Sequence, residues 1–244
     1  MHRPEIREAA LALVEQGVND CEIARRLGVP RGTVRDWRRP RYIARFSRCP
    51  RCWRRARRTV FSDDDYAELL GLYLGDGHIS AAARTQRLRI FLDARYGRIV
   101  AETDALLRRC FPENPIGRVS FHDGAEVVLH VYCGHLSCLF PQHGPGRKHD
   151  RRIVLEAWQR RIVDAAPWAF LRGCIRSDGC VFINRTGRYE YLSYGFANHS
   201  SDILDLFESC CLAQGLRPRR YAQSIRLNRR EDVGRMLEHV GVKS

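Results

Sequence analysis

A nine-residue pattern that occurs twice constrains this chain more than any other feature. Residues 69–77 have the sequence LLGLYLGDG, and residues 171–179 have the sequence LRGCIRSDG. Both copies carry a small residue at the third and seventh positions, then Asp and Gly, and a short alternating run follows each. A repeat of this kind indicates that one supersecondary unit is used twice. We therefore expect two related halves, each built around one copy.

The small residues predict how the two copies meet. Gly71 and Gly75 are four residues apart, as are Gly173 and Ser177, so each pair lies on one face of a helix. A glycine inside a helix costs about 0.5–1 kcal/mol relative to alanine. Close packing of the two helix backbones would compensate for that cost. We expect the two patterns to form paired helices.

The acidic residues then lie together. If the small faces pack against each other, Asp76 and Asp178 emerge side by side at one end of the helix pair. We expect Gly77 and Gly179 to stop the helices in the left-handed conformation. Adjacent carboxylates repel each other unless a cation lies between them. Mg²⁺ is usually held by one or two carboxylates plus substrate phosphate oxygens, so the pattern favours Mg²⁺ or Mn²⁺.

The two stretches resemble the paired motifs of single-chain LAGLIDADG homing endonucleases, over about residues 60–244. The resemblance implies an α+β fold in which two pseudo-symmetric αββαββα halves, residues 61–150 and 151–244, form a saddle over double-stranded DNA. It also implies that Asp76 and Asp178, with carbonyls near Gly75 and Ser177, hold the divalent ions. The purely structural alternative is a pair of amphipathic helices that end in Asp-Gly turns.

The sequence departs from the family pattern at the first acidic position, where it has Leu74 and Arg176. That position is not the catalytic one. The resemblance also draws attention to the basic stretch after the first half, where a lysine in related enzymes stabilises the pentacovalent phosphate. Lys148 is the candidate here and Arg147 the alternate, although a solvated linker explains the stretch equally well. Lys243 lies where a counterpart to Lys148 would fall.

The first forty residues predict a separate domain, residues 1–40. Three helical pieces are separated by Gly17 and Gly28, and Asn19 caps the second piece, with Glu22 reaching back in a capping box. The arrangement resembles the helix-turn-helix of resolvase-like and transposase-like DNA-binding domains. A small helical protein-binding module is the alternative. On the resemblance, the third helix offers its groove and phosphate contacts through Arg31, Gly32, Thr33, Arg35, Asp36 and Arg38.

The charge predicts a polyanionic partner, which we take to be double-stranded DNA. The formal net charge is +14, and Lys148 and Lys243 are the only lysines among 42 basic residues. Arginine suits bidentate contacts to phosphate and guanine. Residues 41–60 form an Arg-rich linker. Three further arginines lie in or beside predicted strands: Arg84, Arg87 and Arg89. They could face DNA, or they could be ordinary outward residues of a half-buried sheet.

Cys49 and Cys52 form a CxxC of zinc-knuckle spacing within that linker. Cys133, His135 and Cys138 would have to complete a Zn²⁺ site across space, because no second pair lies nearby. Two reduced cysteines in a turn are the alternative. The ten cysteines of an otherwise cytosolic-looking chain are expected to be reduced and mostly buried.

Two functions remain open at this stage. The first is a metal-dependent, site-specific DNA endonuclease that works as a monomer, because the duplication supplies its own pseudo-dimer. The second is a non-catalytic transcriptional regulator, since one type of sporulation regulator joins a LAGLIDADG fold without its acids to a helix-turn-helix. A recombinase would leave the repeat unexplained. No apolar run approaches about 18 residues and no signal peptide is evident, so we expect a cytoplasmic, nucleoid-associated protein without a membrane partner.

Overall fold

The computed structural model describes residues 4–38, 62–82 and 85–243. The chain divides into two compact units, Met1–Arg58 and Thr59–Ser244. Residues 41–60, with Cys49 and Cys52, lie outside the described residues, as do Arg84 and the side chains of Asp36 and Arg38. Among the helices that the structure describes, none combines the length and the apolar character needed to cross a membrane.

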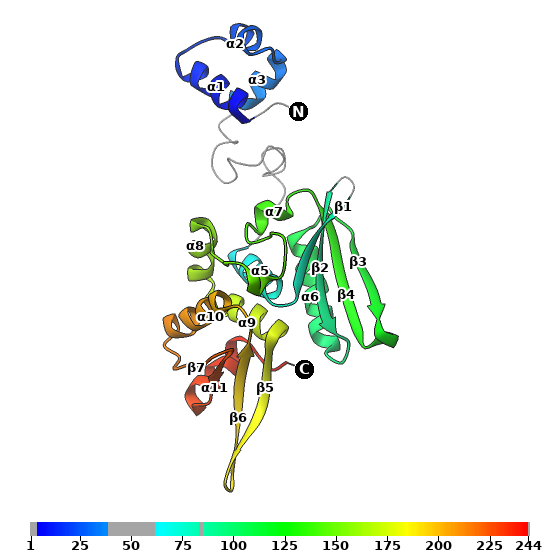
Figure 1. Cartoon of the computed structure of the whole chain (residues 1–244), viewed down its shortest axis with the longest axis vertical. Helices are drawn as coiled ribbons and strands as arrows, with labels where there is room; N and C mark the ends of the chain where they lie inside the picture. Colours follow the sequence, from blue (N-terminus) through cyan, green and yellow to red (C-terminus); the bar gives the residue numbers. More distant parts are fainter. Residues whose placement is uncertain (1–3, 39–61, 83–84, 244) are drawn as a thin grey trace. The chain divides into compact units, whose positions relative to one another are not determined.

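The N-terminal unit is a three-helix domain made of α1 (Pro4–Glu15), α2 (Asp20–Leu27) and α3 (Arg31–Arg38) (Figure 1). Its buried core consists of Ala10, Ile23, Val29, Val34 and Trp37.

The turns of this unit follow the sequence prediction with one exception. Gly17 and Gly28 adopt φ values of +79° and +63°, the left-handed region that glycine tolerates. Asn19 caps α2, because its Oδ1 accepts hydrogen bonds from the backbone of Cys21 and Glu22 at 3.1 and 3.0 Å. The prediction that Glu22 reaches back was wrong. Its carboxylate instead pairs with the arginines one turn along the helix.

The C-terminal unit contains the order αββαββ twice, and at least one helix follows each copy. The first half comprises α5 (Asp63–Leu74), β1 (Gly77–Ala82), β2 (Thr85–Asp93), α6 (Gly97–Cys110), β3 (Ile116–Phe121), the 3₁₀ turn η2 (His122–Gly124) and β4 (Glu126–Cys133). The second comprises α9 (Pro167–Asp178), β5 (Gly179–Thr186), β6 (Tyr189–Ala197), α10 (Ser201–Ala213), β7 (Arg219–Tyr221), β8 (Ser224–Leu227) and α11 (Arg230–His239). The expected architecture is confirmed.

Both sheets have the same strand order, β1-β2-β4-β3 in the first half and β5-β6-β8-β7 in the second. In the first sheet Ile90 pairs with Gly77 and Leu129, and in the second Phe196 pairs with Gly179 and Ile225. This shared register identifies equivalent positions in the two halves. Helices cover one face of each sheet (Figure 1). We call the other face the open face.

Three elements join the halves: α7 (Leu136–Leu139), the 3₁₀ turn η3 (Lys148–Asp150) and α8 (Ala157–Ala165). The sequence did not predict α7. Helix α8 begins only at Ala157, and Ile153 and Leu155 lie buried before it in a segment without helix or strand. The side chain of Gln159 then caps α8 by accepting a hydrogen bond from the backbone N–H of Glu156.

The two motif helices, α5 and α9, pack along their small residues. A Cβ atom on Gly71 would lie 2.6 Å from the carbonyl oxygen of Phe170 and 2.8 Å from the nitrogen of Cys174. A Cβ atom on Gly173 would lie 2.9 Å from the nitrogen of Leu72. Real Cβ atoms do not approach backbone this closely. The close helix pairing that the repeat predicts is therefore present.

The prediction that Gly77 and Gly179 are left-handed helix stops was wrong. Gly179 has an extended backbone, with φ −92° and ψ 165°, and neither glycine has a positive φ. Each is the first residue of a strand that returns onto its own helix. A Cβ atom on Gly77 would lie 2.5 Å from Cα of Tyr73, and one on Gly179 would lie 2.5 Å from Cα of Ile175. Space, rather than backbone conformation, requires glycine at both positions.

Candidate functional site

Two carboxylates meet at the C-terminal ends of the motif helices. Asp178 is the last residue of α9, and Asp76 lies between α5 and β1. A Cβ atom on Gly75 would lie 3.1 Å from Oδ2 of Asp178, so the acid of one helix lies against the end of the other. Burial, followed by the charge of Asp178, raises the pKa of Asp76 to about 6. Burial also raises the pKa of Asp178.

Each copy of the repeat is also bound by a lysine. Nζ of Lys148 donates hydrogen bonds to the carbonyl oxygens of Tyr73, Gly75 and Gly77 at 2.6, 2.5 and 2.9 Å. Nζ of Lys243 donates to the carbonyl oxygens of Ser177 and Gly179, the latter at 3.0 Å.

The two lysines face both acids. Burial lowers the pKa of Lys148 to about 8, and the charges of Asp178 and then Asp76 partly oppose that shift. Burial also lowers the pKa of Lys243, again opposed by Asp76 and Asp178. The centre therefore holds two carboxylates and two ammonium groups from both halves. Sequence spacing drew attention to Lys243 only weakly, and the structure places it in the centre beside Lys148.

The two acids differ in their immediate partners. Nδ2 of Asn198 donates a hydrogen bond of 2.7 Å to Oδ2 of Asp178, which opposes the rise in its pKa. The shared strand register equates Asn198 with Leu92 in the first half. Leucine cannot donate a hydrogen bond, so the Asp76 carboxylate lacks this partner. Sequence analysis missed Asn198, because nothing in the repeat marks a residue at the far end of β6.

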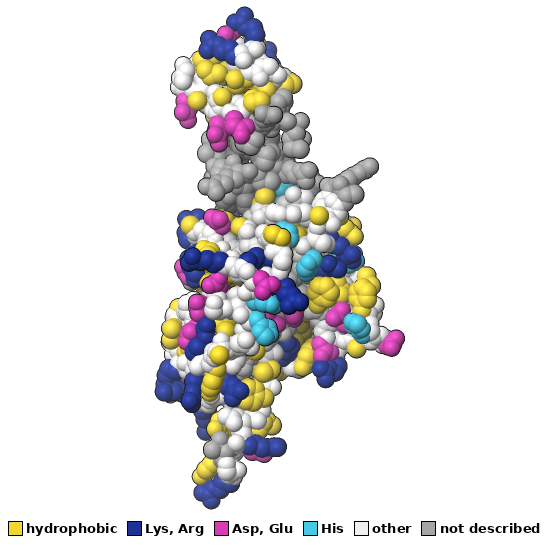
Figure 2. Space-filling view, viewed as in Figure 1, with side chains coloured by type: hydrophobic (Ala, Val, Ile, Leu, Met, Phe, Trp, Pro, Cys, Tyr) yellow, Lys and Arg dark blue, Asp and Glu magenta, His cyan; other side chains and the backbone are white. Residues whose placement is uncertain are grey.

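A cavity of about 620 Å³ opens beside this centre. Lys148 and Asp178 line it, with the backbone of Gly75 and Gly77. Four histidines also line it: His78, His143, His149 and His199. Figure 2 shows histidine side chains beside basic ones on this face of the molecule. A basic, histidine-lined cavity next to buried carboxylates suits a bound phosphate group together with a cation.

The residues present fit a hard divalent cation. The donor set is all oxygen, two carboxylates and the carbonyls of Gly75 and Ser177, which suits Mg²⁺ or Mn²⁺. Repulsion between the carboxylates, seen in the raised pKa of Asp76, is the physical reason that a cation would be favoured there. Lys148 and Lys243 supply that positive charge in this structure by binding the same two carbonyls.

Zinc receives no support from the described part of the chain. Within residues 4–38, 62–82 and 85–243, no three His, Cys, Asp or Glu side chains gather as a metal site would require. Cys133, His135 and Cys138 therefore do not form one together. Five of the eight described cysteines are buried.

Comparison with known proteins agrees with this architecture. Residues 1–40 match the family described as a homeodomain-like domain, HTH_23. Variants of the homing endonuclease I-DmoI align with 73% of this chain and 96% of their own, at 14% identity and a TM-score of 0.51. I-DmoI in complex with DNA and Mn aligns with 73% of this chain and 97% of its own, at 14% identity and the same TM-score.

The C-terminal unit has the LAGLIDADG fold. Full-length DUF199/WhiA from Thermatoga maritima is also similar, at 15% identity and a TM-score of 0.49, over 74% of this chain. The chain spans only 56% of the length of that protein. No curated protein matches the sequence.

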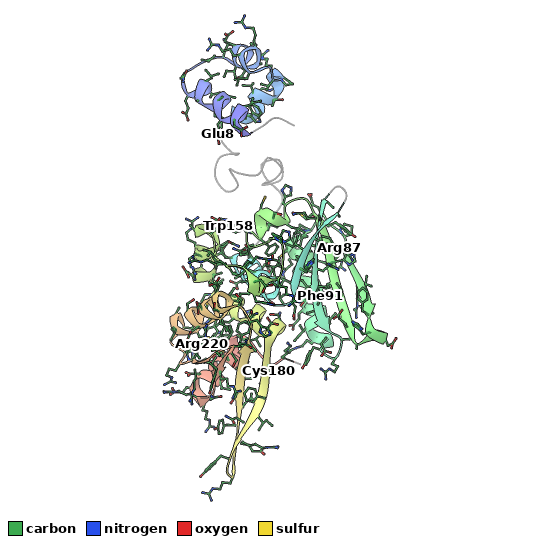
Figure 3. The ribbon with its side chains drawn as sticks, viewed as in Figure 1. Glu8, Arg87, Phe91, Trp158, Cys180 and Arg220 are labelled. Carbon is green, nitrogen blue, oxygen red and sulfur yellow. The ribbon has the colours of Figure 1, made fainter. Side chains whose placement is uncertain are left out.

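The open faces of the LAGLIDADG sheets carry arginines stacked on aromatic rings. In the first sheet Arg87 lies over Tyr132 at 5.4 Å and Arg89 over Phe91 at 5.5 Å, and Figure 3 labels Arg87 and Phe91. The Nε atoms of both arginines have no hydrogen-bond partner among the described residues. Both Nε atoms are buried beneath that face.

The second sheet has its own arginines, which sequence analysis missed. Arg226 lies 5.1 Å from the ring of Tyr221 and 5.8 Å from that of Phe182, and Arg219 lies 5.4 Å from Tyr221. The strands β7 and β8 that carry them are only three and four residues long. Their orientation becomes evident only from the pairing of Arg219 with Arg226 across the two strands.

On α3 of the homeodomain-like unit, the predicted DNA contacts with described side chains lie at the surface. Arg31, Gly32 and Arg35 are exposed on α3 and Thr33 is partly exposed, whereas Val34 and Trp37 of the same helix are buried. In the LAGLIDADG unit Arg147 is exposed at the rim of the cavity. These positions lie free of the core and are available for contacts to a ligand.

Proposed function

We propose that this chain is a site-specific endonuclease that hydrolyses phosphodiester bonds of double-stranded DNA with a divalent metal ion. The observation that carries the proposal is the centre itself. Two buried acids at equivalent positions of a repeat each have a lysine nearby that binds equivalent carbonyls. An ordinary helix pair has no need for two partly buried carboxylates with raised pKa values at its end.

Asp76 and Asp178, with the carbonyls of Gly75 and Ser177, would hold Mg²⁺ or Mn²⁺. The bound ion supplies Lewis-acid polarisation and neutralises charge at a phosphate. The similar structure of I-DmoI in complex with DNA and Mn supports the choice of metal and of substrate for this chain.

The chain's own residues have three tasks in this proposal. Lys148 and Lys243 place positive charge where negative charge develops on the phosphate. If a cation bound the carbonyls of Gly75 and Ser177, the two ammonium groups would have to leave them. Asn198 holds the Asp178 carboxylate in a fixed orientation through its 2.7 Å hydrogen bond. The cavity beside Lys148 offers room for the phosphate.

Recognition of the DNA belongs to the open sheet faces and to the homeodomain-like unit. Arg87, Arg89, Arg219 and Arg226 supply contacts from the two sheets, and α3 supplies contacts through Arg31, Gly32, Thr33, Arg35 and Arg38. Arg147 would contact the phosphate backbone beside the cavity. Since one chain contains both halves, the proposed enzyme acts as a monomer with internal pseudo-twofold symmetry. A nucleoid-associated location in the cytoplasm follows from this function.

The test is to sequence DNA ends after the full chain is incubated with a randomised duplex library, in Mg²⁺ and separately in Mn²⁺. Asp76→Asn is the matched variant, because it removes a charge and keeps the shape of the side chain. Recurrent breaks at one sequence, absent in the variant, are expected. Cleavage by Asp76→Asn at the wild-type rate would overturn the role of the acids.

A second candidate is a DNA-binding regulator that does not cut. It is favoured by the homeodomain-like unit at residues 1–40. The same experiment separates the two functions. If the wild-type protein and Asp76→Asn bind the same sequences and neither breaks them, the regulator is the better account.

A further inference from the structure

The open face of the first sheet divides into two chemically different parts. Toward the β1–β2 hairpin it carries Arg87 and Arg89 with their aromatic partners. At the other end Phe91 pairs with Val128, which pairs with Val119, so these three side chains form one apolar row. In the next row of the same face Asp93 pairs with Glu126, which pairs with Phe121.

The apolar row reaches the surface. Within it Val119 is 37% exposed, Phe91 is partly exposed and Val128 between them is buried, and Phe121 of the next row is 48% exposed. Figure 2 shows hydrophobic side chains gathered over β3 and β4. An apolar patch that is contiguous and rimmed by polar groups marks an interaction site more often than an isolated exposed residue does.

The fold does not require this patch. The register equates Phe91, Val128 and Val119 with Ala197, Ser224 and Tyr221 of the second sheet. There the row holds one small residue, one hydroxyl and one tyrosine instead of three large apolar side chains, and the stacked Arg219 and Arg226 lie beside it. Because the second half folds with Ala, Ser and Tyr at these positions, the large aliphatic and aromatic side chains of the first half need another explanation.

One carboxylate beside the patch is available. Asp93 is engaged by Arg95, whose Nη2 lies 2.7 Å from Oδ2. Glu126 is partly buried, and among the described residues no hydrogen bond or ion pair involves its side chain. The surface therefore offers apolar side chains and one acceptor-only group. This combination is unsuited to phosphate, which carries negative charge.

The edges of DNA bases in the major groove offer the matching chemistry. The C5-methyl group of thymine is the apolar feature of that groove, and the N4 amino group of cytosine is a donor that Glu accepts. Both features belong to pyrimidines. The patch is continuous with the arginine-bearing part of the same open face, which the proposed function already places against DNA.

We propose that Phe91, Val119 and Phe121, with Glu126, read a pyrimidine-rich run on one DNA strand in the major groove. The inference rests on the proposed function only in requiring that the sheets bind DNA, and it holds for an endonuclease and for a regulator. In the second sheet Arg219 and Arg226 suit the O6 and N7 atoms of guanine instead. The two half-sites are therefore unlike in composition.

The first experiment is a binding selection from a randomised duplex library with the Asp76→Asn chain, which binds without cutting. We expect one half of the selected site to contain a run of T and C. Val119→Ser and Phe121→Ser should reduce the preference for T within that run, and Glu126→Gln should reduce the preference for C. The matched variant Tyr221→Ser, at the position equivalent to Val119, should change preferences only in the other half.

A second measurement changes the DNA bound by the Asp76→Asn chain, so its main result does not depend on the folding of any sheet variant. Thymines of the run are replaced by uracil, which lacks only the methyl group. Affinity should fall by roughly fourfold for each contacted methyl, and replacement in the other half-site should have less effect. The loss should be absent with Val119→Ser and Phe121→Ser together.

The outcomes separate the inference from the function on which it rests. If no sequence is selected, DNA recognition by this unit is disproved. A selected site without a pyrimidine run, or with no sensitivity to uracil, overturns the inference and leaves the proposed function intact. A change at the same base positions in Val119→Ser and Tyr221→Ser would also overturn it.

Discussion

Lys148 and Lys243 bind equivalent carbonyls in the two copies of the repeat. Lys148 binds Gly75 and Gly77, and Lys243 binds Ser177 and Gly179. They are the only lysines in a chain with 42 basic residues. Arginine is too large and too planar to place a compact point charge among several carbonyls, whereas an ammonium has three rotatable donors. The geometry explains why lysine stands at these two positions alone.

The first prediction concerns these lysines. If each serves the phosphate of one strand, Lys148→Met should slow cleavage of one strand by about 10²-fold or more and Lys243→Met should slow the other. Each single variant should accumulate nicked circles from a supercoiled plasmid that carries the site, and the double variant should leave the plasmid intact. Strand-specific end labelling identifies the strand. Equal loss on both strands from either single variant would contradict this assignment.

The second prediction concerns pH. Burial and the charge of Asp178 raise the pKa of Asp76 to about 6 from an ordinary value of 3.8. Between these values the folded state binds more protons than the unfolded state, so the free energy of unfolding falls as pH rises through the window. The destabilisation is complete above about pH 6 and absent below about pH 4. Asp76→Asn should therefore raise the free energy of unfolding at pH 8 by up to about 3 kcal/mol.

The measurement is urea unfolding at pH 4 and pH 8, followed by circular dichroism. The gain from Asp76→Asn should vanish at pH 4. Asp164→Asn, at an exposed acid on α8, is the control and should show no such difference. A gain of the same size at both pH values would show that the effect does not come from the charge of Asp76.

The third prediction is that Mg²⁺ stabilises the wild type and not Asp76→Asn. A cation that binds the folded state alone raises the melting temperature by mass action. It also removes the repulsion between the carboxylates, so the effect should be larger at pH 8 than at pH 5. The readout is thermal unfolding over a Mg²⁺ titration, with Na⁺ at equal ionic strength as the control. Equal stabilisation of both proteins would point to binding elsewhere.

The fourth prediction tests the helix pairing. A Cβ atom on Gly71 would lie 2.6 Å from the carbonyl oxygen of Phe170, so Gly71→Ala must push the motif helices apart. We expect a loss of about 1–3 kcal/mol of unfolding free energy from overpacking. Gly234→Ala is the matched control, because Gly234 is an exposed position in α11 with no atom within 4 Å. It should gain about 0.5–1 kcal/mol from helix propensity.

Those glycines show what a sequence can reveal. The spacing of Gly71, Gly75 and Gly173 was sufficient to predict the helix pair and to bring Asp76 and Asp178 together, because helical periodicity is a local property. The same reasoning failed at Gly77. A glycine after an acid fits a left-handed stop as well as an extended strand, and the close return of β1 onto Tyr73 is not a local property.

The same physical reason explains why sequence analysis missed Asn198 and gave little reason to place Lys243 at the site. Asn198 reaches Asp178 from 20 residues away, and Lys243 reaches Ser177 from 66 residues away. Separations of this length along the chain produce no periodic pattern in the sequence. Only the register of β5 with β6, and the path of the chain after α11, bring these residues to the centre. The rarity of lysine was the one signal present in the sequence.

The last prediction concerns the position where the family pattern has an acid and this chain has Arg176. Its two guanidinium nitrogens bind Glu68 of α5 and Glu102 of α6, so it links the second half to the first. Glu68 is only 5% exposed. Burial raises its pKa, and Arg176 and then Arg172 oppose that rise by favouring the charged form. Arg172 lies 3.3 Å away and gives weaker compensation.

Arg176→Met should therefore leave a buried carboxylate with too little positive charge around it. Removing one partner of a buried ion pair typically costs about 3–5 kcal/mol, and the remaining Arg172 should hold the loss near the lower end. The double variant Glu68→Gln with Arg176→Met removes the stranded charge and should recover much of the loss. Urea unfolding of the three variants with the wild type gives the coupling energy directly. If the double variant is as unstable as the sum of the single variants, the network contributes packing and not charge compensation, and the two halves are held together by their glycine-lined helices alone.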